Sequence, residues 1–145
     1  MEGVDGSSTE TEILEKLEKF GITPKSVTLW GTGKPMREFL WSEEMADASV
    51  HVLLNVDFTD TYRKGERDVR NCHINVGTGK EISIREVAMK IMNEIQFKGE
   101  LLWDSSKPDG TMRKLTDVSK LHSLGWHHKI EIDEGIHRLY GWYLS

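Results

Sequence analysis

Two Gly-Thr-Gly triplets constrain the fold of this chain most strongly, because each breaks the backbone directly after a short apolar run. The first triplet, Gly31–Gly33, comes after the alternating apolar residues Val27 and Leu29. The second, Gly77–Gly79, follows the run Cys72–Val76. Apolar runs of this length bounded by glycine are typical of short strands that end in turns. The sequence therefore predicts short strands that lead into irregular loops.

Helices with recognisable caps separate these strands. Ser83 and Glu86 form a capping box in front of an amphipathic helix predicted over 84–95. Ser7 and Thr9 each stand three residues before a glutamate, Glu10 and Glu12, ahead of a second helical pattern. Further helices are predicted to begin at the capping residues Ser42, Asp117 and Asp133, and further strands at 38–40 and 101–103. Together these segments predict a small mixed α+β fold with four to five helices.

Three segments complete the predicted organisation. The helix that begins at Ser42 is expected to bury an apolar face made of Met45, Ala46, Val50, Val52, Leu53 and Leu54. The charged stretch 57–71 has no helical apolar spacing and is expected to be an exposed connection. The first eight residues have the composition of a linker. We therefore expect a linker and amphipathic helix over 1–25, followed by one domain over 26–145.

The composition is that of a globular protein and excludes some classes of partner. With 145 residues and 37% hydrophobic content, the chain can bury one compact core. Its net charge of −5 gives no general attraction to nucleic acid or to acidic membrane surfaces. No apolar run approaches the roughly 20 residues of a membrane span, and no signal peptide is recognisable. With its single cysteine, Cys72, the sequence indicates a cytoplasmic protein.

Positive charge gathers on two loops marked by glycine and proline. These basic clusters are Lys34 with Arg37, and Lys107 with Arg113 and Lys114. Arginine and lysine can bind the oxygens of a nucleotide diphosphate, and Asp109 in the second loop can accept a hydrogen bond from a sugar hydroxyl. Short basic stretches are more often solvated surface, so the pattern alone leaves both interpretations open. Trp30 is equally open, because a tryptophan at a strand end can pack against a base or belong to the core.

Other chemistries find little support in the sequence. The six histidines, His51, His73, His122, His127, His128 and His137, show no zinc-binding spacing, so no metal is expected. Gly77–Gly79 belongs to no dinucleotide fingerprint or P-loop and is expected to be a tight turn between strands. Cys72 lies in no recognisable signature of a nucleophile with its base, which favours a small buried side chain. No tyrosine precedes a lysine by four residues, the pair that a short-chain reductase needs. Catalytic residues are therefore not predicted.

Three longer motifs carry a resemblance to a known family. They are V-T-L-W-G-T-G-K-P-M-R-E-F-L from Val27, C-H-I-N-V-G-T-G-K-E-I-S-I-R-E from Cys72, and W-D-S-S-K-P-D-G-T-M-R-K-L-T-D from Trp103. From Val27 to Tyr143 the chain resembles the GDP-L-fucose synthase family of extended short-chain dehydrogenases/reductases. The chain departs from the family pattern at 41–44, where Trp-Ser-Glu-Glu stands, and at Met112, which replaces a proline.

The resemblance implies a function for 26–145 as the substrate-binding lobe of such an enzyme, with the Rossmann domain absent from this chain. It implies that Trp30, Arg37, Asp109 and Lys114 face a GDP-sugar, with Arg37 and Lys114 on the diphosphate. The parent enzyme would use NADPH and form a homodimer, and its missing amino-terminal Rossmann domain would hold the cofactor. We expect no cofactor on this chain and no activity from it alone. The alternative is a stand-alone, non-catalytic module that binds a nucleotide sugar.

Overall fold

The computed structural model describes residues 4–62, 65 and 69–145. Parts of the expected linker and of the connection 57–71 therefore lie outside the described residues. The chain forms two compact units, each made of two separate stretches. Unit 1 comprises Met1–Pro35 and Ser83–Met112, and unit 2 comprises Met36–Ile82 and Arg113–Ser145. The functional division at residue 25 stays a prediction.

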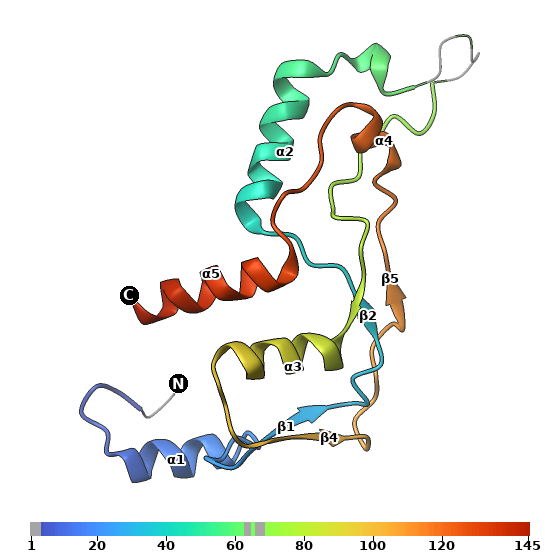
Figure 1. The fold of residues 1–145 in the computed structure, drawn as a ribbon. Helices are drawn as coiled ribbons and strands as arrows, with labels where there is room; N and C mark the ends of the chain where they lie inside the picture. Colours follow the sequence, from blue (N-terminus) through green and yellow to red (C-terminus); the bar gives the residue numbers. More distant parts are fainter. Residues whose placement is uncertain (1–3, 63–64, 66–68) are drawn as a thin grey trace. The chain divides into compact units, whose positions relative to one another are not determined.

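Unit 1 is built around a pair of parallel strands. It contains helices α1 (Glu10–Glu18) and α3 (Ile84–Glu94) and strands β1 (Ser26–Trp30) and β4 (Glu100–Asp104). β1 and β4 run side by side over five residues, from Ser26 opposite Glu100 to Trp30 opposite Asp104 (Figure 1). Both strands therefore end at the same edge of the pair, and the loops that follow them start from neighbouring points.

Local capping accounts for both helices of unit 1. The predicted capping boxes at Thr9 with Glu12 and at Ser83 with Glu86 are confirmed, each closed by reciprocal hydrogen bonds. After α1 the chain turns at Gly21, whose φ of +75° lies in the left-handed region that favours glycine. A Cβ atom at this position would lie 2.9 Å from Cβ of Thr28, so the turn also leaves no room for a side chain.

Unit 2 consists mainly of helices and very short strands. Its elements are α2 (Ser42–Asn55), α4 (Ser119–Ser123), α5 (Ile132–Leu144), the 3-10 helix η1 (Phe58–Asp60) and the strands β2 (Met36–Arg37) and β5 (Arg113–Lys114). β2 lies between β5 and β3 (Ile82–Ser83), a strand at whose last residue the chain passes into unit 1. With five α-helices and short strands among the described residues, the predicted mixed fold is confirmed. No helix of the described chain is long and apolar enough to span a membrane.

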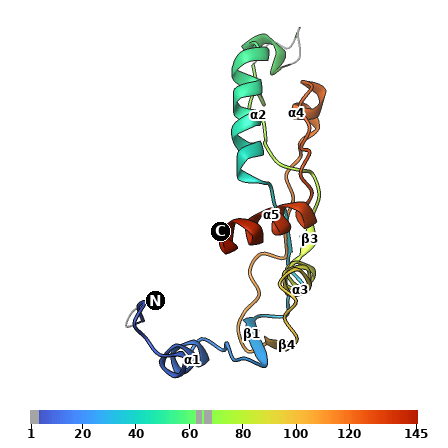
Figure 2. The same ribbon diagram turned by 60° about the vertical axis from the view of Figure 1, so that its left-hand side comes forward.

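The core of unit 2 lies between α2 and α4, which Figure 2 shows side by side. Ala48 of α2 and Leu121 of α4 are fully buried, and Trp126 is 4% exposed. Four partly buried residues pack around these three: Leu40, Val52, Ile74 and Val76. The indole Nε1 of Trp126 also donates to the Asp47 carboxylate at 2.8 Å, so this buried polar group is satisfied.

Two predictions for α2 are wrong. Trp41 is the N-cap and Ser42 is the first helical residue, with no side-chain cap. The helix buries Glu44 and Ala48, whereas Leu53 and Leu54 of the expected apolar face are 81% and 74% exposed. A backbone N–H of the segment after Trp126 explains the buried acid, because Ile130 N donates to Glu44 Oε1 at 3.1 Å. The side of α2 that faces the core therefore carries an acid held by a hydrogen bond beside the apolar residues Ala48 and Val52.

The segment 71–80 also differs from its prediction. The strand predicted over Cys72–Val76 forms no β-ladder, and Cys72 is exposed, so the predicted buried side chain is wrong. Lys120 fixes this segment from α4: its Nζ donates to the carbonyls of His73 at 3.0 Å and Thr61 at 2.9 Å. Side-chain bonds to carbonyls therefore replace part of the ladder that the alternating pattern predicts.

Candidate functional site

The loops after β1 and β4 carry the candidate residues of unit 1. Gly31 N donates to the carbonyl of Asp104 at 2.9 Å, which joins the two loops where the strands end. The carboxyl ends of parallel strands are where open α/β folds bind ligands. Three candidate residues belong to this edge, since Trp30 ends β1 while Lys107 and Asp109 lie in the loop after β4.

Asp109 ties the second loop to the first Gly-Thr-Gly triplet. Thr32 donates twice to the carboxylate, from its backbone N to Oδ1 at 2.8 Å and from its hydroxyl to Oδ2 at 2.6 Å. Hydrogen bonds from the Thr32 hydroxyl and then from its N–H lower the pKa of Asp109. Gly31 has φ +79°, and a Cβ there would lie 2.4 Å from Asp109 Oδ1. The Asp109 carboxylate therefore acts as a latch: it holds the loop after β4 to the loop after β1 and leaves no room for a side chain at Gly31.

Trp30 stands out from this edge with 75% of its surface exposed. Of the two interpretations that the sequence left open, membership of the core is wrong. Lys107 Nζ lies 5.7 Å from the centre of the Trp30 ring, within the range of a cation–π contact. An exposed indole with a cation near one ring face can pack against a planar base or the apolar face of a sugar.

Arg37 and Lys114, the other two predicted substrate-binding residues, lie in unit 2. The parallel register of β2 and β5 places Arg37 opposite Lys114, and residues opposite each other on neighbouring strands project to the same face of a sheet. Lys114 is exposed, and Arg37 is half-buried with Nη1 donating to the carbonyl of Met36 at 2.6 Å. Two adjacent cations on one face can bind two oxygens of a diphosphate.

Arg113 has a different partner from its neighbour Lys114. Its Nε donates to Glu81 Oε2 at 2.8 Å, an ion pair within unit 2. This ion pair balances the charge of Arg113. Lys34, which belongs to the first basic cluster, has an exposed side chain. The structure thus separates the five basic residues into a pair aligned by strand register, Arg37 with Lys114, and three others that it places individually.

Glu38, which the sequence did not single out, fixes the strand that carries Arg37. Its Oε1 accepts hydrogen bonds from the N–H groups of Thr78 and Gly79, both at 2.6 Å, and its Oε2 accepts one from Thr116 N at 3.1 Å. A Cβ at Gly77 would lie 2.5 Å from Oε1. The second Gly-Thr-Gly triplet is therefore a cradle for a protein carboxylate, and the expected turn between strands is wrong.

Replacing Glu38 with glutamine should destabilise unit 2 in a pH-dependent way. Burial raises the pKa of Glu38, but hydrogen bonds from Thr116, Gly79 and Thr78 outweigh burial and leave it below its ordinary value of 4.5. The stabilisation is thus complete above pH 4.5 and is lost as pH falls through the lowered pKa. We expect Glu38→Gln to cost about 1–3 kcal/mol at pH 7 and to remove this acid-dependent loss. Urea unfolding between pH 7 and pH 3 measures both effects.

The matched control is Glu134→Gln, which removes an exposed carboxylate from an i,i+4 pair with Arg138. Such a pair contributes only about 0.3–0.5 kcal/mol. Equal losses of stability for the two variants, or equal slopes of stability against pH, would show that Glu38 is an ordinary surface acid.

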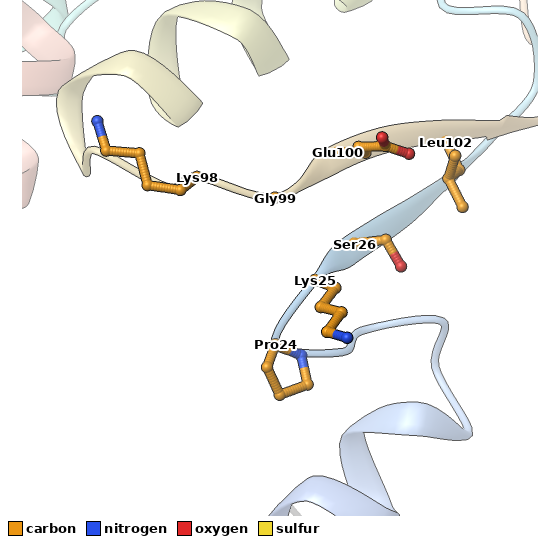
Figure 3. A pocket seen from close by; sticks show the side chains of 7 residues that line it. All are labelled: Pro24, Lys25, Ser26, Lys98, Gly99, Glu100 and Leu102. Carbon is orange, nitrogen blue, oxygen red and sulfur yellow. The ribbon is translucent and has the colours of Figure 1, made fainter.

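An open hollow in unit 1 lies away from these residues. Figure 3 shows it at the beginning of β1 and β4, with Lys25, Lys98 and Glu100 among its lining residues. Trp30 and Asp109 lie at the opposite ends of the same strands, so the hollow does not include them. Within residues 4–62, 65 and 69–145, no group of three or more histidine, cysteine or acidic side chains is arranged to hold a metal ion.

The fold and the motifs that carry these residues define a protein class. The chain belongs to the NAD dependent epimerase/dehydratase family, whose model matches residues 5–77. Within that class it is similar to GDP-L-fucose synthase of Escherichia coli strain K12, at 45% identity over 119 residues. The putative GDP-L-fucose synthase 2 of Arabidopsis thaliana is 46% identical over 119 residues. The resemblance predicted from the motifs is confirmed.

Solved structures give the same class. A GDP-6-OMe-4-keto-L-xylo-heptose reductase from Campylobacter jejuni is 47% identical, with a TM-score of 0.87 over 94% of this chain and 39% of that one. A GDP-mannoheptose C4 reductase from the same organism, solved with NADP bound, is 44% identical, with a TM-score of 0.80 over 95% of this chain and 38% of that one.

The similarity covers most of this chain but a minor part of each relative. The two synthase matches cover 82% of this chain, 36% of the Escherichia coli protein and 33% of the Arabidopsis protein. The chain thus spans about a third of the length of the curated relatives that it matches.

Proposed function

We propose that this chain supplies the GDP-sugar-binding part of an NADPH-dependent enzyme of the GDP-L-fucose synthase type. Such an enzyme converts GDP-4-keto-6-deoxy-D-mannose to GDP-L-fucose by 3,5-epimerisation and 4-reduction. The observation that carries the proposal is the register pairing of Arg37 with Lys114. In a chain with a net charge of −5, two cations aligned on one face are a local device for binding an anion.

Each of the four candidate residues would have a separate role in binding the GDP-sugar. Arg37 would bind two diphosphate oxygens through its planar fork, and Lys114 would add a point charge beside it. Trp30 would pack its exposed ring against the base or the sugar. Asp109, with both oxygens bonded to Thr32, would hold the loop that carries Trp30 and accept a sugar hydroxyl only through its remaining lone pairs.

The nicotinamide cofactor would be held elsewhere in the parent enzyme. In both Gly-Thr-Gly triplets backbone N–H groups already donate to protein carboxylates, Thr32 to Asp109 and Thr78 with Gly79 to Glu38. They do not fit a dinucleotide pyrophosphate, which needs such donors unoccupied. This supports assigning cofactor binding and hydride transfer to an amino-terminal Rossmann domain. The parent enzyme as a homodimer is part of the same proposal.

A GDP-heptose 4-reductase is the second candidate for the parent activity. Its support is the identity of 44–47% to the two Campylobacter jejuni heptose reductases, which is close to the 45–46% identity to the Escherichia coli and Arabidopsis synthases. Both candidates share the GDP half of the substrate and differ in the sugar. Incubating the full-length protein and NADPH with GDP-4-keto-6-deoxy-D-mannose and with a GDP-4-keto-heptose, and analysing the product sugars, decides between them.

An activity assay of the chain alone tests whether the chemistry belongs to another domain. We expect no oxidation of NADPH when the purified 145-residue chain meets GDP-4-keto-6-deoxy-D-mannose, and turnover when the full-length protein does. Turnover by the chain alone would contradict the assignment of chemistry to another domain.

Direct titration distinguishes the lobe from a stand-alone binding module. Part of a cleft lacks contacts and preorganisation, so we expect GDP to bind the chain with an affinity on the order of millimolar, about −4 kcal/mol. Because two cations meet the diphosphate, GMP should bind more weakly than GDP. Micromolar binding of GDP would favour the module. No binding of GDP even at tens of millimolar would contradict a GDP-sugar role for these loops.

A further inference from the structure

The loop that carries the first Gly-Thr-Gly triplet is held from the first turn of α3. Ile84 N donates to the carbonyl of Pro35 at 3.0 Å, and Arg85 N donates to that of Gly33 at 2.9 Å. The Arg85 side chain adds a third bond, from Nη2 to the carbonyl of Thr32 at 2.8 Å. Three donors from two consecutive residues fix a loop that has no ladder of its own.

Arg85 also stacks on an aromatic ring in the same unit. Its guanidinium carbon lies 4.4 Å from the centre of the Trp103 ring, a close cation–π contact. Gly33 lies against the same two side chains: a Cβ on it would be 2.5 Å from Trp103 ring atoms and 3.0 Å from Cβ of Arg85. With φ +74° as well, this position can hold only glycine without rearrangement. The stack therefore confines the backbone of the loop.

Thr32 connects this confined loop to the candidate residues of unit 1. Arg85 holds its carbonyl, and Asp109 holds its N–H and hydroxyl. Trp30 lies two residues before Thr32, and Lys107 lies two residues before Asp109. A side chain that fixes Thr32 therefore constrains both loops that present the exposed indole and its neighbouring cation.

Stability of α3 does not account for an arginine here. Arg85 occupies the first turn, where the positive end of the helix dipole disfavours a cation. The Ser83 and Glu86 capping box closes this terminus without Arg85. One contact of the guanidinium, with the Thr32 carbonyl, is made to the loop itself, and the other is made to Trp103 of β4, against which Gly33 of the loop also lies.

We propose that Arg85 is a positioning residue for nucleotide-sugar binding, because it clamps Thr32 and thereby sets the orientation of Trp30 and of the Asp109 latch. The inference deepens the proposed function and rests on it for the nature of the ligand. Arg85 itself touches no part of the ligand in this assignment.

The test uses the isotope-labelled 145-residue chain and NMR, in which the five tryptophan indole signals are resolved and Trp30→Phe assigns the one that matters. Without ligand, Arg85→Gln should shift or broaden the Thr32 amide signal and the Trp30 indole signal. On titration with GDP it should weaken binding about three- to tenfold and reduce the Trp30 response. Arg85→Lys keeps the charge and one donor, so it should recover part of both effects.

Arg138→Gln is the matched control, because it removes the same side chain and charge from α5, where Arg138 pairs with Glu134. Unchanged Thr32 and Trp30 signals in ligand-free Arg85→Gln, or full GDP affinity in that variant, would overturn the positioning role. If the unsubstituted chain shows no response to GDP, the proposed function fails. The ligand-free signals of Arg85→Gln then still decide whether Arg85 orders the loop. If Arg85→Gln unfolds, Arg85→Lys is compared with the unsubstituted chain in the same two measurements, the ligand-free signals and the affinity for GDP.

Discussion

In the proposed parent enzyme, Arg37→Ala should lower kcat/KM for the GDP-sugar by about ten- to a few-hundred-fold. Hydrogen bonds that involve an ionised group contribute about 1.5–3 kcal/mol each, and a guanidinium can make two of them to a diphosphate. The β2–β5 register sets Lys114 beside Arg37, but lysine presents no planar fork. Arg37→Lys should therefore recover only part of the loss. Steady-state kinetics with saturating NADPH measures the effect.

Folding should not account for this loss of activity. Arg37 is half-buried and lies at the end of a two-residue strand, and Glu38 supplies the bonds that fix that strand to the second triplet. We expect the melting temperature of Arg37→Ala to stay close to that of the parent protein. Arg138→Ala serves as a control for the loss of an arginine from unit 2. Normal kinetics together with an unchanged melting temperature would show that Arg37 is ordinary surface charge.

Trp126→Ala should lower the free energy of unfolding of unit 2 by about 3–5 kcal/mol. The central cluster of this unit contains only Ala48, Leu121 and Trp126 among the described residues, so removing its largest side chain leaves little apolar contact. The change also leaves the Asp47 carboxylate without its indole donor. Because small domains are stable by only about 5–15 kcal/mol, the variant should be largely unfolded at moderate urea concentrations. Far-ultraviolet circular dichroism during urea titration measures the shift.

Trp142→Ala is the internal comparison for this prediction, since Trp142 is 74% exposed in α5. A substitution at such a position usually changes stability by no more than about 0.5 kcal/mol. Equal shifts for Trp126→Ala and Trp142→Ala would mean that burial in this cluster does not determine the stability of unit 2.

The features that sequence reasoning predicted correctly are those fixed by near neighbours. The capping boxes at Thr9 and Ser83 depend on residues three positions away, and the strand pattern of Val27 and Leu29 depends on alternation over five residues. Such interactions can be read from a single stretch of chain.

The incorrect predictions have long-range causes. The second Gly-Thr-Gly triplet closes around Glu38, 40 residues earlier for Thr78, and the same carboxylate accepts from Thr116, 78 residues later. No local pattern marks a glutamate for this role. The burial of Glu44 in α2 has a similar origin, since this carboxylate accepts from a backbone N–H 86 residues away. Hydropathy cannot reveal that a charged residue will be buried by a distant N–H group.

The candidate site shows the same division. The motifs pointed to Trp30, Arg37, Asp109 and Lys114, but the pairing of Arg37 with Lys114 depends on a strand register that no local spacing specifies. Arg85 was missed because it lies within an ordinary amphipathic helix. Its position in the first turn, against the helix dipole, was the one signal that the sequence offered.

The alternation of the chain between its two units bears on how such a protein can exchange parts with its relatives. β1 and β4 form one parallel pair but belong to stretches separated by residues 36–82, which lie in the other unit. A gene hybrid with a single crossover inside that interval would take β1 and Trp30 from one parent, and β4 and Asp109 from the other. Transfer of ligand preference between homologues therefore requires crossovers outside this interval, so that both strands and both loops move together.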